Sequence, residues 1–437
     1  MSSAFSALKQ LNTFLWSGPL LFLLMGTHLY FTMKLHFPQK KILSAVKLSI
    51  LPEKKEDGKN LSVFGALATT LAATLGTGNI VGVSTAVALG GPGAIFWCWI
   101  TGILGMATSY AECYLGVLYK SRGKDGLYHG GPMYVWENGL HNKFIAKAYA
   151  ALTLLAAFGA GCTTQSNSLA QTAHTTFGLS PHIVGFSAAL ITGLIIIGGI
   201  RSIGNVCMKL VPGLALLYMA SCFLLLFINR EALLPAIELI LTHALAPRSI
   251  GGGLVGGSLM LTARYGIARG LFTNEAGIGT AAITAAASET TTPARQAYVS
   301  MTAVFWDTVV MCLLSGLVIV TNMLRHPESL TGVNEAGLTD AAFAYLPFGG
   351  NIFLSLCMIA FAITTLIGWS YLGESAATYL AGAKGIFFYK VAYIVMIYVG
   401  AVLPLSFVWE STDFINALML IPNVAALFLL KKHITVK

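Results

Sequence analysis

Long apolar stretches dominate this chain, and they restrict the folds it can adopt more than any other feature. Only 10% of the 437 residues are charged, whereas 56% are hydrophobic. A helix needs about 20 apolar residues to cross the hydrocarbon core of a bilayer. Stretches of about this length or longer occur at residues 14–33, 62–90, 93–119, 145–170, 181–199, 205–228, 252–283, 297–322, 351–380, 386–406 and 408–430. The sequence therefore predicts an all-α polytopic membrane protein with eleven transmembrane helices in a lipid bilayer.

Basic residues predict how these helices are oriented. If the Lys-rich loop 34–61 lies in the cytoplasm, alternation of the spans places most of the 26 Lys and Arg residues on the same side. The N-terminus is then outside and the C-terminus is cytoplasmic. Because the basic residues follow the loops rather than one soluble face, the net charge of +9 does not indicate a nucleic-acid partner. The first stretch is longer than the apolar region of a typical signal peptide, so we expect it to be retained.

Two of the stretches are interrupted by glycine and polar residues near their middle. Stretch 62–90 contains Gly76-Thr77-Gly78-Asn79, and stretch 252–283 contains Phe272-Thr273-Asn274-Glu275-Ala276-Gly277-Ile278-Gly279. Unwound backbone at this depth is tolerated only where it is buried in protein or lines a water-filled cavity. Close helix packing would explain the glycines, but it requires neither Asn79 nor the Asn274-Glu275 pair. We interpret both interruptions as helix breaks at a binding site.

The position of the breaks predicts an inverted repeat. Residues 1–61 would form an extra N-terminal helix and a basic cytoplasmic loop, followed by a five-helix repeat at 62–230 and a second one at 251–437. Each break lies in the first helix of its set, so the first and sixth core helices are broken. Because five is odd, the second set enters the membrane upside down. Such paired broken helices are typical of secondary transporters.

The ends of broken helices also indicate the ligand. The first N–H groups of a half-helix suit a carboxylate, and the last carbonyl groups suit an ammonium group or a sodium ion. The two kinds of helix end together predict a zwitterionic ligand.

Several longer motifs resemble the alanine or glycine:cation symporter family. They are GTGNIVGV at 76–83, GGPGAIFWCW at 90–99, GGPMY at 130–134, the run Gln165-Ser166-Asn167-Ser168 and ARGLFTNEAGIGTA at 268–281. The resemblance covers nearly the whole chain. It implies a leucine-transporter-type fold of the amino acid-polyamine-cation superfamily, and sodium-coupled import of alanine or glycine, in L or D form, across a bacterial or archaeal inner membrane. It implies no cofactor, with sodium as a co-transported ion. Cys98 replaces a usual Met, and residues 282–286 lack the usual Pro and His, which leaves the gating on the cytoplasmic side open.

The resemblance also implies which residues bind the ligands. For the amino acid these are Thr77, Gly78, Asn79, Gln165, Phe272, Thr273, Gly277, Thr365 and Trp369. Phe272 would act as a gate, and the bulk of Trp369 would limit the substrate side chain. One sodium site would combine the carbonyl groups of Ala72 and Leu75 with the hydroxyl groups of Thr364 and Thr365, and a second would use Asn79, Thr273 and Asp307.

Other interpretations of the same residues remain open. Thr364 and Thr365 can instead bond carbonyl groups of their own helix, Asp307 can be a structural acceptor, and Glu275 can brace the second break. A proton-coupled carrier on the same fold is the alternative function, and an ion channel is a more distant one. The sequence contains no HExxH, GxSxG or P-loop motif, so we do not expect an enzyme.

Overall fold

The computed structural model describes residues 2–51, 60–123, 125–245, 259–290, 292–330, 332–347, 349–403 and 406–436. Within these residues, seven helices are long and apolar enough to cross a membrane, or eight if one bent pair is counted as a span. This confirms a largely helical, multi-pass protein. The total of eleven spans and the inverted repeat remain predictions.

The first part of the chain supplies the first broken helix and a small hairpin. Its elements are α1 (Ser2–Ser17), α2 (Pro19–Lys34), the 3-10 turn η1 (Pro38–Lys41), α3 (Ile42–Ile50), α4 (Val63–Thr74), the 3-10 turn η2 (Thr77–Asn79), α5 (Val81–Gly90), α6 (Ala94–Leu118), β1 (Ser121–Arg122) and β2 (Tyr128–His129). Strands β1 and β2 pair antiparallel. The predicted first span corresponds to α1 and α2 together, which meet at Gly18.

The middle of the chain is a series of long helices. Its elements are α7 (Pro132–Tyr134), the π-helical turn η3 (Val135–Gly139), α8 (Lys143–Phe158), the π-helical turn η4 (Gly159–Thr163), α9 (Thr164–Phe177), α10 (Pro181–Ile197), α11 (Gly199–Ile228) and α12 (Arg230–Leu245). The sequence predicts only a loop where α12 lies. Ala236, Ile240 and Ala244 recur at every fourth position and are all buried, so one face of α12 packs on the protein although Pro235 lies within the helix.

The last part supplies the second broken helix and the longest helical segment. Its elements are α13 (Leu259–Asn274), α14 (Thr280–Ala286), α15 (Pro293–Val304), the π-helical turn η5 (Phe305–Cys312), α16 (Leu313–Arg325), the 3-10 turn η6 (Pro327–Leu330), α17 (Leu338–Phe343), α18 (Gly350–Val402) and α19 (Ser406–Leu429). The part of the predicted span 252–283 before Leu259 lies outside the described residues.

Helix α18 is two antiparallel helices joined at Gly382. This glycine has φ 65° and ψ −158°, a conformation that other residues rarely adopt. Beyond the turn the chain folds back, so that the Tyr393 hydroxyl donates to the Leu366 carbonyl at 2.9 Å. The two halves correspond to the separate spans predicted at 351–380 and 386–406.

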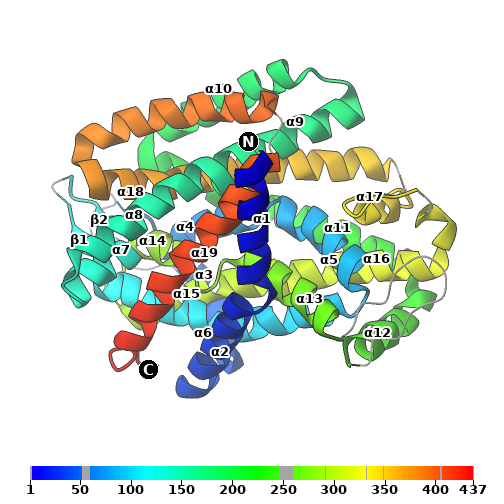
Figure 1. Ribbon diagram of the computed structural model, residues 1–437, viewed down its shortest axis with the longest axis horizontal. Coiled ribbons are helices and arrows are strands. Elements are labelled where there is room, and N and C mark those ends of the chain that lie inside the picture. The colour runs from blue at the N-terminus through cyan, green and yellow to red at the C-terminus, as the bar shows by residue number, and fades with distance from the viewer. Residues whose placement is uncertain are drawn as a thin grey trace.

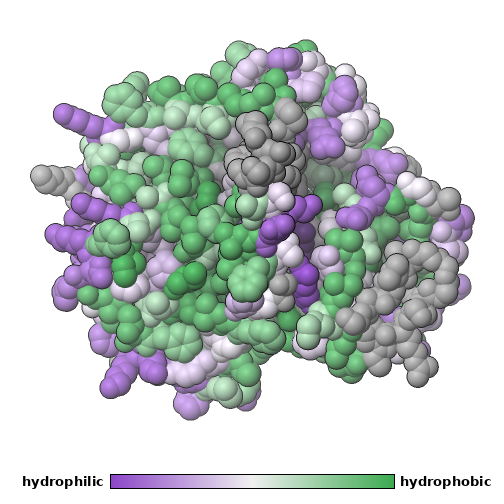
Figure 2. All heavy atoms as spheres, in the orientation of Figure 1, coloured by the Kyte–Doolittle hydropathy of each residue, from purple (hydrophilic) through white to green (hydrophobic). Residues whose placement is uncertain are grey.

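Most long helices run along the longest axis of the molecule, which is horizontal in Figure 1. The β1–β2 hairpin lies at one end of this axis, and α12 and α17 lie at the other. Hydrophobic residues cover most of the middle of the visible face, whereas hydrophilic residues gather mainly at its two ends (Figure 2). This distribution fits helices that cross a bilayer from the hairpin end to the α12–α17 end.

Candidate functional site

The first predicted break is present between α4 and α5. Helix α4 ends at Thr74, and the axis turns by 59° before the chain continues as a helix. Leu75 and Gly76 are extended, and the Gly76 N–H donates to Oδ1 of Asn79 at 3.2 Å. A side chain within the break therefore replaces a lost helical partner of the backbone.

Asn79 also connects this break to the π-helical turn η5. Its Nδ2 donates to Oδ1 of Asp307 at 2.6 Å and to the Asp307 carbonyl at 3.1 Å. Thr308 donates to the other carboxylate oxygen at 2.9 Å, and the Thr308 and Thr273 hydroxyls are 3.4 Å apart. The predicted second ion set, Asn79, Thr273 and Asp307, thus forms one buried polar cluster.

A second polar group adjoins the break where α18 passes it. The Thr365 hydroxyl donates to the Leu75 carbonyl at 3.3 Å and to the Phe361 carbonyl of its own helix at 2.9 Å. A Cβ atom placed on Gly76 would lie 3.0 Å from the Thr365 hydroxyl and 3.7 Å from Oε1 of Gln165. That Gln165 oxygen is buried and has no hydrogen-bond partner. An unpaired acceptor therefore faces the first break.

The other predicted ligand residues near α18 do not contact the unwound backbone of the first break in the same way. They are Thr364 and Trp369 on α18 and Ala72 on α4. The Thr364 hydroxyl donates only to the Phe361 carbonyl, within its own helix. Trp369 is buried against the turn η4, because a Cβ atom on Gly161 would lie 2.3 Å from Trp369 Cβ. Ala72 packs directly on α18, since a Cβ atom on Gly368 would lie 3.0 Å from its carbonyl carbon.

The second predicted break spans residues 275–279, between α13 and α14. Three of its residues have positive φ: Glu275 at 54°, Gly277 at 101° and Gly279 at 96°. Phe272 and Thr273 still belong to α13, so the helix unwinds slightly later than the sequence motif suggests. The Arg269 guanidinium lies 5.3 Å from the centre of the Phe272 ring. The first break contacts the last turn of α13, because a Cβ atom on Gly78 would lie 3.0 Å from Cγ2 of Thr273.

Three other helices hold this second break in place. Oε1 of Glu112 on α6 accepts hydrogen bonds from the Gly277 N–H at 2.8 Å and from Nδ2 of Asn423 on α19 at 2.5 Å. Asn423 also donates to the Gly277 carbonyl at 2.8 Å, and the Tyr149 hydroxyl of α8 donates to the Ile278 carbonyl at 2.7 Å. The Gly277 N–H, the Gly277 carbonyl and the Ile278 carbonyl, which lie outside a helix, are therefore all hydrogen-bonded, as buried backbone groups require.

These contacts change the interpretation of two predicted residues. The polar backbone groups of Gly277 are bonded to Glu112 and Asn423, so the structure does not bring Gly277 into the cluster at the first break. Glu275 accepts a hydrogen bond from the Thr280 hydroxyl at 2.6 Å, whereas the backbone is braced by Glu112. Sequence reasoning missed Glu112 and Asn423. The signal that points to them is a carboxylate or amide within a predicted span, where polar groups are costly.

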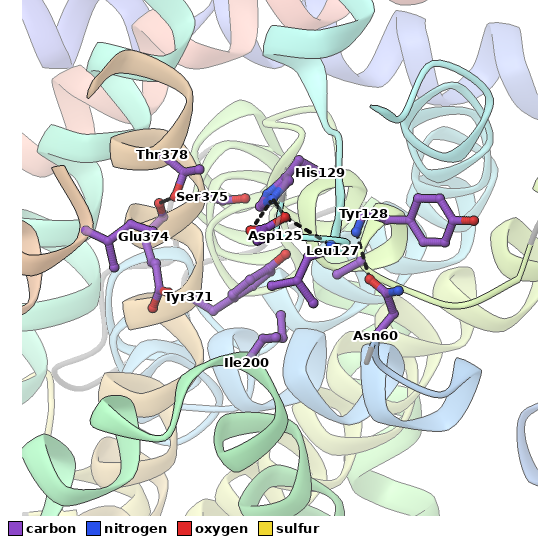
Figure 3. Close-up of a pocket in the computed structure, with 12 residues that line it drawn as sticks. Asn60, Asp125, Leu127, Tyr128, His129, Ile200, Tyr371, Glu374, Ser375 and Thr378 are labelled. Atoms are coloured by element: carbon purple, nitrogen blue, oxygen red, sulfur yellow. Dashed lines mark hydrogen bonds and ion pairs between the residues drawn. The ribbon is translucent and has the colours of Figure 1, made fainter. Parts of the chain in front are cut away.

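A separate polar pocket of about 60 Å³ lies at the hairpin end of the molecule (Figure 3). It lies between the hairpin and α18, where His129 contacts Asp125 at 3.1 Å and Lys390 contacts Glu374 at 3.3 Å. The Tyr128 N–H donates to Oδ1 of Asn60 at 2.7 Å, which fastens the hairpin to the start of α4. The Tyr128–Asn60 bond is therefore the contact in this group that joins the hairpin to another part of the chain.

Further bonds at the same end join the two broken helices. The Leu61 N–H donates to the Ala287 carbonyl at 3.1 Å, and the Glu289 N–H donates to the Leu61 carbonyl at 2.8 Å. The Lys120 ammonium donates to the carbonyls of Ser288 and Thr290 at 2.9 and 2.7 Å. The residues before α4 and after α14 are therefore tied together.

The sequence is similar to those of known transporters over nearly its whole length. The whole sequence, residues 1–437, matches the family described as the sodium:alanine symporter family. It is 42% identical over 432 residues to the sodium/alanine symporter AgcS of Methanococcus maripaludis, covering 97% of this chain and 94% of that protein. It is also 42% identical over 435 residues to an uncharacterized transporter of Haemophilus influenzae, covering 98% of this chain and 94% of that protein.

The fold is similar to that of a solved sodium-coupled transporter. A substrate-bound, outward-open sialic acid symporter superposes with a TM-score of 0.61, covering 93% of this chain and 85% of that chain at 11% sequence identity. At this identity the likeness shows the fold alone, which is the leucine-transporter type that the motifs imply.

Proposed function

The chain belongs to the sodium:alanine symporter family, and we propose that it imports a small neutral amino acid, alanine or glycine, together with sodium. In this proposal it is a multi-pass protein of the bacterial plasma membrane and works by alternating access, with no cofactor. The observation that carries the proposal is the contact between the two broken helices, where Gly78 meets Thr273 beside buried polar groups that lack partners.

The amino acid would bind at the first break. The turn η2 and helix α5 begin there, and the first N–H groups of a helix favour a carboxylate. We assign this role to Thr77, Gly78 and Asn79, with Gln165 at the carboxylate end. Its buried Oε1 lacks a protein partner and its Nε2 donates to the Ala160 carbonyl at 3.3 Å, so the side-chain amide would turn to present Nε2 to the carboxylate.

The rest of the substrate pocket would come from α13 and α18. Phe272, backed by Arg269, would cover the bound molecule, and Thr273 would line it. Thr365 and Trp369 are one helical turn apart and would bound the side-chain pocket. Gly277 would shape the second break through its bonds to other helices rather than contact the substrate.

Sodium would bind where the carbonyl groups at the end of α4 meet α18. Helix α4 leaves its last carbonyls without helical partners, and their negative dipole end favours a cation. The Leu75 carbonyl and the Thr365 hydroxyl already lie 3.3 Å apart, so a small ion could bridge them together with Ala72. Thr364 completes the proposed set after its hydroxyl turns away from the Phe361 carbonyl. The cluster of Asn79, Thr273 and Asp307 is the proposed second ion site.

Alternating access requires contacts at the two ends of the site to open in turn. We assign the hairpin end to the cytoplasm, because the basic loops lie there, with the N-terminus outside and the C-terminus inside. The bonds of Asn60, Leu61 and Lys120 would then form the cytoplasmic closure and would break when the substrate is released.

An ion-replacement experiment tests the proposal. We expect purified protein in proteoliposomes to accumulate labelled alanine or glycine along an inward sodium gradient, with saturation as the amino acid concentration rises. Replacing sodium by choline should stop uptake, with protein-free liposomes as the control. Uptake that is indifferent to sodium but follows a proton gradient would support a proton-coupled carrier, and flux that rises linearly without saturation would indicate a channel.

A further inference from the structure

Two pairs of threonines face each other across α4 and α14. Thr70 and Thr74 are four residues apart on α4, and Thr280 and Thr284 are four residues apart on α14, so each pair lies on one helical face. All four side chains line one small, partly open space together with Glu275. This space is distinct from the contact between Leu75 and Thr365, because no residue of α18 except Leu372 reaches it within the described chain.

At one end of this space two threonine hydroxyls bond each other, whereas at the other end a threonine hydroxyl is unpaired. The hydroxyls of Thr70 and Thr284 are joined by a 2.6 Å hydrogen bond, and Thr70 also donates to the Ala66 carbonyl of its own helix. Thr74 is also buried, yet its hydroxyl has no hydrogen-bond partner. A buried threonine in a helix normally donates to the carbonyl one turn earlier, as Thr69 does. The Thr74 oxygen is therefore an acceptor that the protein leaves unused.

A carboxylate reaches the same space. The positive φ of Glu275 turns its side chain toward α14, where Oε2 accepts a hydrogen bond from the Thr280 hydroxyl at 2.6 Å. No Lys, Arg or His of the described chain forms an ion pair with Glu275. The Glu275 residue is half-buried, and a carboxylate that is partly removed from water favours a proton or a counter-cation.

The oxygen atoms here suit a sodium ion. Thr74 and Thr280 provide hydroxyls, Glu275 provides a carboxylate, and Ala73 and Thr74 belong to the last turn of α4, whose carbonyls carry the negative end of the helix dipole. Hard cations prefer oxygen ligands of this kind, and broken helices supply them in transporters.

We propose that Thr74, Glu275 and Thr280, with carbonyl groups at the end of α4, form an additional sodium site between the two broken helices. The site lies between the first break and the closure at the hairpin end, so sodium would occupy it on its way to the cytoplasm. This inference rests on the proposed sodium coupling, but it uses a set of ligands that the two sites described above do not include.

Equilibrium binding of radioactive sodium to the purified full-length protein, without amino acid and at constant ionic strength, tests the site. We expect Thr74→Val to weaken sodium binding about tenfold, because one ligand is lost while the shape is kept. Glu275→Gln should lower the number of sodium ions bound at saturation. The matched control is Thr69→Val, which makes the same change five residues earlier on α4, where the hydroxyl already has a carbonyl partner.

The outcomes separate this site from the proposed function. If the wild type binds no sodium, the coupling itself is wrong. If Thr365→Val weakens sodium binding while Thr74→Val and Glu275→Gln bind as the wild type does, only the additional site is refuted. If Thr74→Val weakens alanine binding but not sodium binding, the oxygens hold the substrate ammonium group instead, which also refutes it. A Glu275→Gln protein that does not fold leaves the decision to Thr74→Val.

Discussion

The two helix breaks are both marked by glycine in the sequence, but they are stabilised in opposite ways. The first has Gly76 in an ordinary extended conformation, and its own Asn79 side chain reaches back to bond the backbone. The second requires three residues with positive φ and is held from outside by Glu112, Tyr149 and Asn423. A similar motif therefore produces a break whose backbone is bonded by its own Asn79 side chain in one place, and a break whose backbone is bonded by other helices in the other.

This difference suggests that the first break binds ligands and that the braced backbone of the second break contributes to stability. At the first break, the side-chain oxygens Gln165 Oε1 and Thr74 Oγ1 lie near the unwound chain and have no hydrogen-bond partner in the protein. A bound ligand or ion can therefore supply the missing partner. At the second, the backbone groups of Gly277 and Ile278 are already paired with other helices. We expect changes at the first break to affect binding and transport, and changes to the braced Gly277–Ile278 backbone of the second to affect stability.

The largest effect should come from Asn79→Ala. This change removes the bonds to Gly76 and to Asp307, and bonds to a buried carboxylate contribute about 1.5–3 kcal/mol each. Sodium-dependent alanine uptake in proteoliposomes should fall by about 100-fold or more. Asn138→Ala is the control, because Asn138 makes its bonds near the hairpin rather than at a break. Normal transport by the Asn79 variant would show that the first break does not have the binding role that distinguishes it from the second.

Glu112→Ala should mainly lower stability. It leaves the Gly277 N–H and Asn423 without their acceptor, which should cost about 2–3 kcal/mol in the free energy of unfolding. Glu112→Gln keeps an oxygen acceptor and should recover part of this loss. Thermal unfolding of the two purified variants measures the difference. If Glu112→Ala unfolds like the wild type, the second break does not depend on this brace.

A pair of glycine substitutions compares the two backbones directly. Gly277→Ala places a Cβ atom on a residue with φ 101° and within 2.4 Å of Leu24, and it should cost about 1–3 kcal/mol. Gly76→Ala introduces no such backbone strain, since Gly76 is extended, but its Cβ would lie 3.0 Å from the Thr365 hydroxyl. We expect the first variant to melt earlier and the second to keep its melting temperature while its sodium affinity falls. If Gly76→Ala melted earlier and Gly277→Ala lost sodium affinity instead, the two breaks would not have the separate roles in binding and stability that we expect.

The smallest effect should be a change in selectivity from Trp369→Ala. Removing the indole opens space beside Gly161, and each methylene group accommodated is worth about 1–3 kcal/mol in discrimination. Uptake of leucine relative to alanine should rise about tenfold, measured by competition in proteoliposomes. Unchanged relative uptake would show that Trp369 serves packing alone.

Much of the fold follows from local features of the sequence. Seven or eight apolar spans, the break at Gly76–Asn79 and the break before Thr280 are present in the described residues. Helix α12 was missed because Pro235 and several polar residues obscure a face that only tertiary packing buries. The separation of the two spans within α18 was predicted, although Gly382 joins them without a loop.

The sequence by itself determined that the chain is a helical multi-pass membrane protein, where two of its helices break and to which family it belongs, because hydrophobic length and glycine content act within a single helix. Only the tertiary structure decided which side chains meet at those breaks. Asn79 and Asp307, or Glu112 and Gly277, are more than 150 residues apart, and their contacts depend on how separate helices pack. Pairing of polar groups across helices is a property of that packing, so no local pattern specifies it.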